Sequence, residues 1–181
     1  MNLQGSSNSF AFEAIPSMNE ARSLFGYTVC KDSFIYVAGG VSTSLKSTCT
    51  DTVETFSILE NKWTLLQLRI PQKLCGISCV YFEEEEKLRI FGGSDNFKKS
   101  SKSVFELNIN DVTINEVGSM DSRRNMNNKV FKKNHFLYLV GGNNDNEYEV
   151  WNFSSDAKTR LIFSYGNAMK GDLNNFCGFA L

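Results

Sequence analysis

A run of apolar residues followed by two glycines occurs three times in this 181-residue chain, over residues 34–40, 88–93 and 136–142. The first glycines of the pairs are 53 and then 49 residues apart. A period of this size indicates a repeat architecture, in which each unit buries its apolar faces only by stacking on its neighbours. The sequence therefore constrains the chain to an array of similar units. The glycine pairs are Gly39 and Gly40, Gly92 and Gly93, and Gly141 and Gly142.

Other residues recur in step with the glycine pairs. A valine followed three positions later by an apolar residue comes after each pair, and the valines are Val53, Val104 and Val150. Beyond each valine, corresponding places hold Trp63, Ile114 and Arg160, and a basic residue precedes each copy: Arg22, Lys73 and Arg124. In the first copy the strand candidates cover residues 25–30, 34–38, 52–58 and 63–67. No stretch has a helical period, so each copy is interpreted as four short strands.

The order of basic residue, apolar-Gly-Gly, Val-x-x-apolar and Asn-x-Trp resembles the kelch repeat, and residues 51–64 are the best match. The resemblance implies an all-β fold: a partial kelch-type β-propeller with three four-stranded antiparallel blades. The blades are expected at about residues 22–67, 73–117 and 124–163. Ile114 and Arg160 depart from the family's tryptophan, so looser packing is expected there.

The flanking residues are expected to complete this picture. Residues 1–8 are predicted to be a flexible N-terminus and residues 9–181 to form the propeller segment. Residues 9–15 and 173–181 are predicted to be strands of half-blades that flank the three full blades. Because three blades make only an arc with exposed edges, we expect a longer propeller or a partner that completes the ring. Closure by a second chain is the less favoured alternative.

Three sets of residues are assigned structural roles. The glycine pairs allow a close approach of backbones where blades converge. Trp63 is expected to fill the space between blades. The basic residues Arg22, Lys73 and Arg124 are expected to brace the blades by bonding backbone carbonyl groups, with ligand binding as the alternative.

The loops after Gly-Gly and the connections between blades are predicted to form a mostly basic rim at one end of the arc. The candidate partner-binding residues are Arg22, Lys46, Phe97, Lys98, Lys99, Arg123 and Arg124. Guanidinium and ammonium groups bind carboxylates and phosphates, so the rim is interpreted as a site for an acidic or phosphorylated peptide. The alternative is that these lysines only solvate a loop.

Composition excludes several classes of function. The 19 Lys and Arg against 20 Asp and Glu give a net charge of -1, which argues against nucleic-acid and membrane partners. A single histidine and five cysteines without a C-x-x-C pair predict no metal, no cofactor and a reducing, cytoplasmic setting. The predicted function is a non-catalytic scaffold or adaptor that binds a protein partner. The alternatives are a structural subunit of a cytoskeletal or ciliary assembly and, less favoured, an enzyme acting on a sugar.

Overall fold

The computed structural model describes residues 13–43, 48–96, 98–125, 129–134, 136–142, 147–152 and 159–164. Over these ranges the chain forms strands and turns and no helix. Three four-stranded antiparallel units, called blades here, follow one another along the sequence. Blade 1 comprises β2 (Gly26–Cys30), β3 (Phe34–Ala38), β6 (Thr52–Ser57) and β7 (Lys62–Arg69).

The other two blades repeat this order of strands. Blade 2 comprises β8 (Ser78–Phe82), β9 (Lys87–Phe91), β11 (Lys99–Asn108) and β12 (Thr113–Arg124). Blade 3 comprises β13 (Lys129–Lys133), β14 (Phe136–Val140), β15 (Glu147–Asn152) and β16 (Thr159–Ser164). The expected three-blade, all-β architecture is therefore confirmed.

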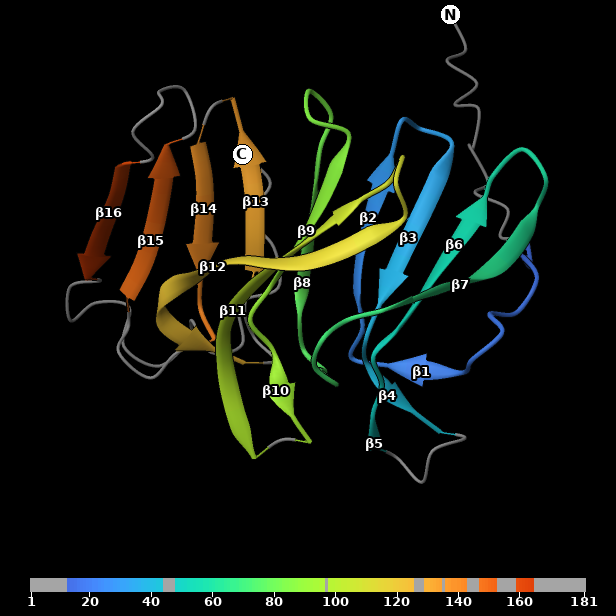
Figure 1. Ribbon diagram of the computed structural model, residues 1–181, viewed down its shortest axis with the longest axis horizontal. Coiled ribbons are helices and arrows are strands. Elements are labelled where there is room, and N and C mark those ends of the chain that lie inside the picture. Colours follow the sequence, from blue (N-terminus) through green and yellow to red (C-terminus); the bar gives the residue numbers. More distant parts are fainter. Residues whose placement is uncertain are drawn as a thin grey trace, which may run out of the picture.

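The blades stand side by side in an arc, with blade 2 between the other two (Figure 1). The first strand of blade 2, β8, packs against the first strands of both neighbours, β2 and β13. Short strands lie at one end of the blades: β1 (Arg22–Ser23), β4 (Val41–Ser42) and β5 (Thr48–Cys49) form a small sheet, and β10 (Ser94–Asp95) pairs with β11. The segments after Gly-Gly and those between blades therefore share one end of the arc.

Two apolar cores lie between the blades. The first packs blade 1 residues such as Tyr36 and Val53 against blade 2 residues such as Ile90 and Phe105. The second packs Phe91 of blade 2 against blade 3. Each sheet is thus covered by its neighbour, which is why the apolar runs of the sequence are almost continuous.

The glycine pairs have backbone conformations and contacts that other residues would not tolerate. Gly39 has a φ of 58°, and an added Cβ would lie 2.4 Å from the carbonyl oxygen of Leu74 at the start of blade 2. The amide of the adjacent Gly40 donates to the same oxygen at 2.9 Å. The close approach expected of the glycine pairs is therefore a direct contact between one blade and the next.

Strand register places equivalent residues of the three blades. Val53 pairs with Ala38 and Val104 pairs with Phe91, each directly before its glycine pair. In blade 3, Glu149 pairs with Leu139, two positions before Gly141. By register Tyr148, and not Val150, therefore occupies the place of Val53 and Val104. The expected alignment of the third copy is wrong by two residues.

Ile114 and Arg160 do occupy the place of Trp63, because they pair across from the equivalent residues Leu107 and Trp151.

Two further expectations concern the first blade and the chain before it. Trp63 lies on the side of blade 1 that faces away from blade 2, so its expected role between two blades stays a prediction. It is half-buried, packs on Phe56 with ring centroids 5.1 Å apart, and donates its indole N–H to the carbonyl of Pro16 at 2.9 Å. The expected strand at 9–15 is not formed by residues 13–15, which are extended chain without strand pairing. Its other residues, together with 1–8 and 173–181, lie outside the described residues.

Candidate functional site

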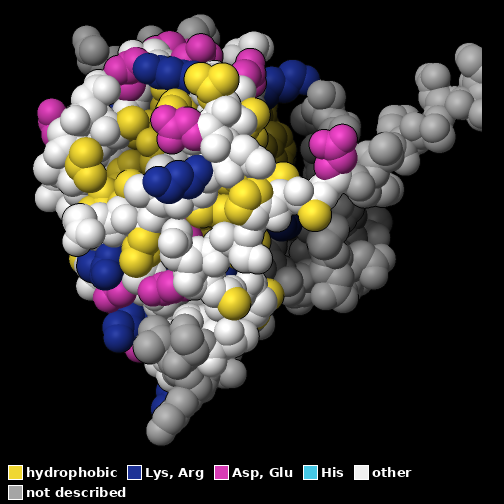
Figure 2. All heavy atoms as spheres, turned by 90° about the vertical axis from the view of Figure 1, so that its right-hand side faces the viewer, with side chains coloured by type: hydrophobic (Ala, Val, Ile, Leu, Met, Phe, Trp, Pro, Cys, Tyr) yellow, Lys and Arg dark blue, Asp and Glu magenta, His cyan; other side chains and the backbone are white. Residues whose placement is uncertain are grey.

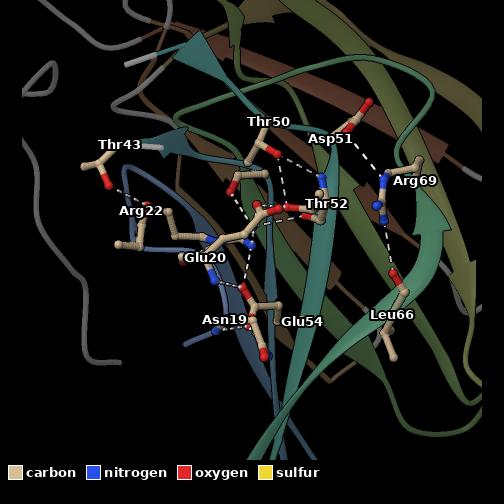
Figure 3. A network of polar contacts seen from close by, with 12 residues as sticks. Asn19, Glu20, Arg22, Thr43, Thr50, Asp51, Thr52, Glu54, Leu66 and Arg69 are labelled. Carbon is tan, nitrogen blue, oxygen red and sulfur yellow. Dashed lines mark hydrogen bonds and ion pairs between the residues drawn. The ribbon is translucent and has the colours of Figure 1, made fainter. Parts of the chain in front are cut away.

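The basic residue before blade 1 is the centre of a buried polar network (Figure 3). The fully buried guanidinium of Arg22 donates from Nη2 to Glu54 at 2.6 Å and from Nη1 to the carbonyls of Gly39 and Thr52 at 3.0 and 3.2 Å. Glu54 also accepts hydrogen bonds from the backbone amides of Asn19 and Glu20. The pair thus fixes the chain before blade 1 to the third strand of its sheet.

Blade 3 repeats this network. Arg124 donates to Glu149 at 3.1 Å and to the carbonyl of Gly141 at 2.7 Å, and both charged side chains are buried. Glu149 accepts from the backbone amides of Asp121 and Ser122, at the end of β12. The segment around Asn19 therefore occupies, before blade 1, the place that the end of β12 occupies before blade 3.

Blade 2 has an apolar pair in the same place. Leu74 corresponds to Arg124, because their carbonyls accept the amides of Gly40 and Gly93 respectively. Phe105 pairs with Ile90, two positions before Gly92, and so corresponds to Glu54 and Glu149. Leu74 and Phe105 are both buried in the core between blades 1 and 2. The expected brace at Lys73 is thus displaced by one residue and is apolar, whereas Lys73 itself is exposed.

Arg22 and Arg124 therefore do not belong to an exposed basic rim. Their side chains are buried and bonded to carboxylates and backbone carbonyls, as expected of braces and not of a ligand-binding surface. Of the predicted rim residues that the structure describes, Lys98, Lys99 and Arg123 are exposed.

The carboxyl of Glu54 supports a prediction about pH. Burial disfavours its charged form, but hydrogen bonds from Asn19 and Glu20 and the charge of Arg22 outweigh burial and hold its pKa below the ordinary 4.5. The unfolded chain therefore binds more protons, and the stabilisation is present above pH 4.5 and lost as pH falls through the lower folded pKa. In thermal melts from neutral pH to about pH 3, Glu54→Gln should lose less stability on acidification than the wild type. An equal loss of thermal stability in the two proteins on acidification would contradict the lowered pKa of Glu54.

A cleft of about 590 Å³ opens at the Gly-Gly end of blade 2. The segment before blade 2, the β10–β11 region and the end of β12 all contribute to it. Its charged lining residues are Lys73, Lys99, Lys102, Arg123 and Asp95. The polar remainder of the lining is Gln72, Ser100, Ser101 and Ser103. Lys99 and Arg123 are thus brought together, although they lie on different strands of the predicted rim.

The cations of the cleft differ from many others on this chain. Lys31, Arg69, Lys87, Arg89 and Lys132 each form an ion pair with a glutamate or aspartate. Within the described part of the chain, no ion pair engages Lys73, Lys99, Lys102 or Arg123, and all four are exposed. Arg123 donates to the carbonyl of Ser100 at 2.8 Å, which holds its side chain along the cleft wall. Four cations beside a single carboxylate give the cleft a positive potential.

The remaining predicted rim residues are placed less centrally. Lys98 is exposed in the turn between β10 and β11, beside the cleft but not in its lining. Lys46 and Phe97 lie outside the described residues. Sequence reasoning did not identify the contribution of Gln72 or the serine hydroxyls. A run of serines around a lysine could have indicated this hydroxyl-lined cleft in the sequence: Ser100, Ser101, Lys102 and Ser103.

Two buried cysteines of the described structure have strongly perturbed thiols. Burial raises the pKa of Cys30 to about 12 and also raises that of Cys79, so both remain protonated thiols. Among the described residues, no group of three or more His, Cys, Asp and Glu side chains is arranged to hold a metal ion. The same part of the chain contains no helix long and apolar enough to cross a membrane.

Comparison with known proteins agrees with the fold. No protein-family model matches the chain. Mouse Kelch-like protein 40 is 33% identical over 103 residues, which are 57% of this chain and 16% of the mouse protein. The solved structure of YjhT, a kelch-type propeller, superposes with a TM-score of 0.74 at 12% identity, over 90% of this chain and 57% of that one.

This chain therefore spans about a sixth of the mouse relative and somewhat more than half of YjhT. The likeness to YjhT shows the fold alone. Together, the three Gly-Gly blades in register, the sequence match to a kelch-like protein and the structural match to YjhT show a partial β-propeller fold and support the resemblance to the kelch repeat.

Proposed function

We propose that this chain is a protein-interaction module whose rim cleft binds an acidic or phosphorylated segment of a partner protein. Kinship with kelch-like proteins supports an interaction role in general. The observation that carries the specific proposal is the cleft itself. Its described lining has four cations without an ion-pair partner, several serine hydroxyls and a single carboxylate, that of Asp95; the cations are Lys73, Lys99, Lys102 and Arg123.

The chemistry of the cleft suits an extended anionic peptide. Arg123 presents a planar guanidinium that can bind a carboxylate or phosphate through two parallel hydrogen bonds. Lys99 and Lys102 supply point charges from β11, and half-buried hydroxyls such as that of Ser103 can donate to the same oxygens. Charge attracts the partner to the cleft, and the hydroxyls select its register.

Fluorescence anisotropy with a labelled octaglutamate peptide, and with a phosphoserine peptide of equal length, tests this proposal. The double variant Lys99→Glu with Arg123→Glu should weaken binding of either probe by about tenfold or more, because each lost charged hydrogen bond costs about 1.5–3 kcal/mol. The probe that binds more tightly identifies the preferred anion.

A matched control is available in Lys62 and Lys133, which are exposed on the first and third blades and outside the cleft. The variant Lys62→Glu with Lys133→Glu changes the net charge by the same amount and should bind nearly as well as the wild type. Equal losses in the two double variants would show non-specific attraction and reject the cleft as the site.

A further inference from the structure

Ser100 belongs to the wall of the cleft described above. It is the second residue of β11, is half-buried and lines the cleft. Its carbonyl accepts a hydrogen bond from Nη1 of Arg123 at 2.8 Å, so the guanidinium lies beside Ser100. A chemical change at Ser100 would therefore take place next to a cation that the proposed function assigns to the partner's anion.

The other serines of this run are less available for modification. Ser101 is buried, and its hydroxyl accepts the backbone amide of Ser103 at 3.1 Å. Ser103 lies further along β11, where it pairs with Ser119 of β12. Ser100 instead lies beside the β10–β11 turn, and none of the described residues bonds its hydroxyl. Ser100 is therefore the serine of the run that a modifying enzyme can use.

A cation-rich sequence surrounds Ser100. Lys98 and Lys99 precede it directly, and Lys102 follows two positions later. All three lysines are exposed, and within the described ranges no ion pair engages Lys99 or Lys102. At the blade 1 end of the arc, by contrast, basic and acidic side chains are interspersed (Figure 2). An anion on Ser100 would therefore meet cations that no bonded carboxylate already neutralises.

We propose that Ser100 is a phosphorylation site and that its phosphoserine occupies the cleft in place of the partner's anion. The proposal rests on the proposed function, because the cleft that binds the partner is the one that becomes filled. A protein kinase that prefers basic residues before serine transfers the γ-phosphoryl group of ATP. A bond forms between phosphorus and Oγ of Ser100, the bond from phosphorus to the β–γ bridging oxygen breaks, ADP leaves, and the kinase's catalytic aspartate accepts the hydroxyl proton.

The chemistry of the cleft favours this internal ligand. A phosphoserine carries a charge of about -1.5 to -2 at pH 7 and three strong acceptor oxygens. Arg123 can donate to it through two parallel hydrogen bonds, and Lys99 and Lys102 supply point charges. A tethered anion has an effective concentration of about millimolar or more, so it competes strongly with a free segment of a partner. Phosphorylation thus releases the partner from the cleft.

Phosphorus NMR tests the placement of the phosphate without any peptide. In the full chain with phosphoserine incorporated at position 100, the cations favour the dianion, so its second pKa should lie at least about half a unit below the ordinary value of about 6. Adding Arg123→Gln should reverse most of this shift. The control carries phosphoserine at position 33, an exposed residue in the turn between β2 and β3, where Lys31 is already paired with Glu86. Equal pKa values at positions 100 and 33 would overturn the proposal, as would loss of the strand spectrum in circular dichroism on modification at position 100.

Fluorescence anisotropy with labelled octaglutamate tests the release. Phosphoserine at position 100 should weaken binding by about tenfold or more, and phosphoserine at position 33 should leave it nearly unchanged. Equal binding by the two modified chains would overturn the proposal. If the unmodified chain binds no anionic peptide, the proposed function fails, and the phosphorus titration alone decides whether the phosphate of Ser100 lies among the cations.

Mass spectrometry tests the modification itself. The full chain is incubated with ATP and the catalytic subunit of a kinase that prefers basic residues before serine. We expect phosphate on Ser100, and loss of that site in the variant Ser100→Ala. Phosphate on other serines of the chain with none on Ser100 would overturn the assignment.

Discussion

Arg22→Leu is expected to lower the free energy of unfolding by about 3–5 kcal/mol, because it leaves Glu54 buried without its cation. The guanidinium donates to Glu54 and to the carbonyls of Gly39 and Thr52, and the side chain has no access to solvent. Leucine replaces none of these hydrogen bonds. Urea unfolding followed by circular dichroism at neutral pH measures the change.

Blade 2 supplies the compensating substitution. Leu74 and Phe105 stand where blade 1 has Arg22 and Glu54. Arg22→Leu combined with Glu54→Phe should therefore recover stability to within about 1 kcal/mol of the wild type, since a well-packed apolar pair can replace a buried ion pair. Adding Asn19→Pro gives blade 1 all three residues of the blade 2 site, because Pro71 corresponds to Asn19. Proline has no amide N–H, so it does not need the acceptor that Glu54 provides to Asn19. A double variant as unstable as Arg22→Leu would show that the two blades are not interchangeable at this site.

Gly39→Ala is expected to be the second strongly destabilising change. Its φ of 58° costs a side-chain-bearing residue about 1–2 kcal/mol, and the clash of the new Cβ with the Leu74 carbonyl adds about 1–3 kcal/mol. The oxygen cannot move away without weakening its hydrogen bond from Gly40 at 2.9 Å. The same urea titration measures the loss.

Gly118 in β12 is the matched control for this change. An added Cβ at Gly118 meets nothing within 4 Å. Gly118→Ala should therefore leave stability within about 1 kcal/mol of the wild type or raise it slightly, through a less flexible unfolded chain. Similar losses at both glycines would contradict the idea that Gly39 is required for contact between blades.

The sequence alone predicted the number of blades and the strand order within them. These features follow from local patterns, because the apolar run, the glycine pair and the polar turns each act within a few residues. Trp63 and Ile114 could be aligned for the same reason, since a hairpin of equal length joins the third and fourth strands of blades 1 and 2. Arg160 reaches the equivalent place although Val150 does not, because the hairpin of blade 3 is two residues longer. Blade 3 shows the limit of this reasoning, because its third strand is displaced by two residues relative to the expected alignment.

The tertiary structure decided the role of each basic residue. Arg22 and Arg124 meet their glutamates across 32 and 25 residues of sequence, whereas Lys73 lies one residue before the equivalent position and is exposed. A one-residue shift at a β-type position turns a side chain from the interior to the surface, and no local pattern records it. The cleft likewise depends on Lys73, Lys99 and Arg123 arriving from three separate segments. Repeats in a chain determine which strands form, but the register between distant strands determines which charges are buried and which remain to meet a partner.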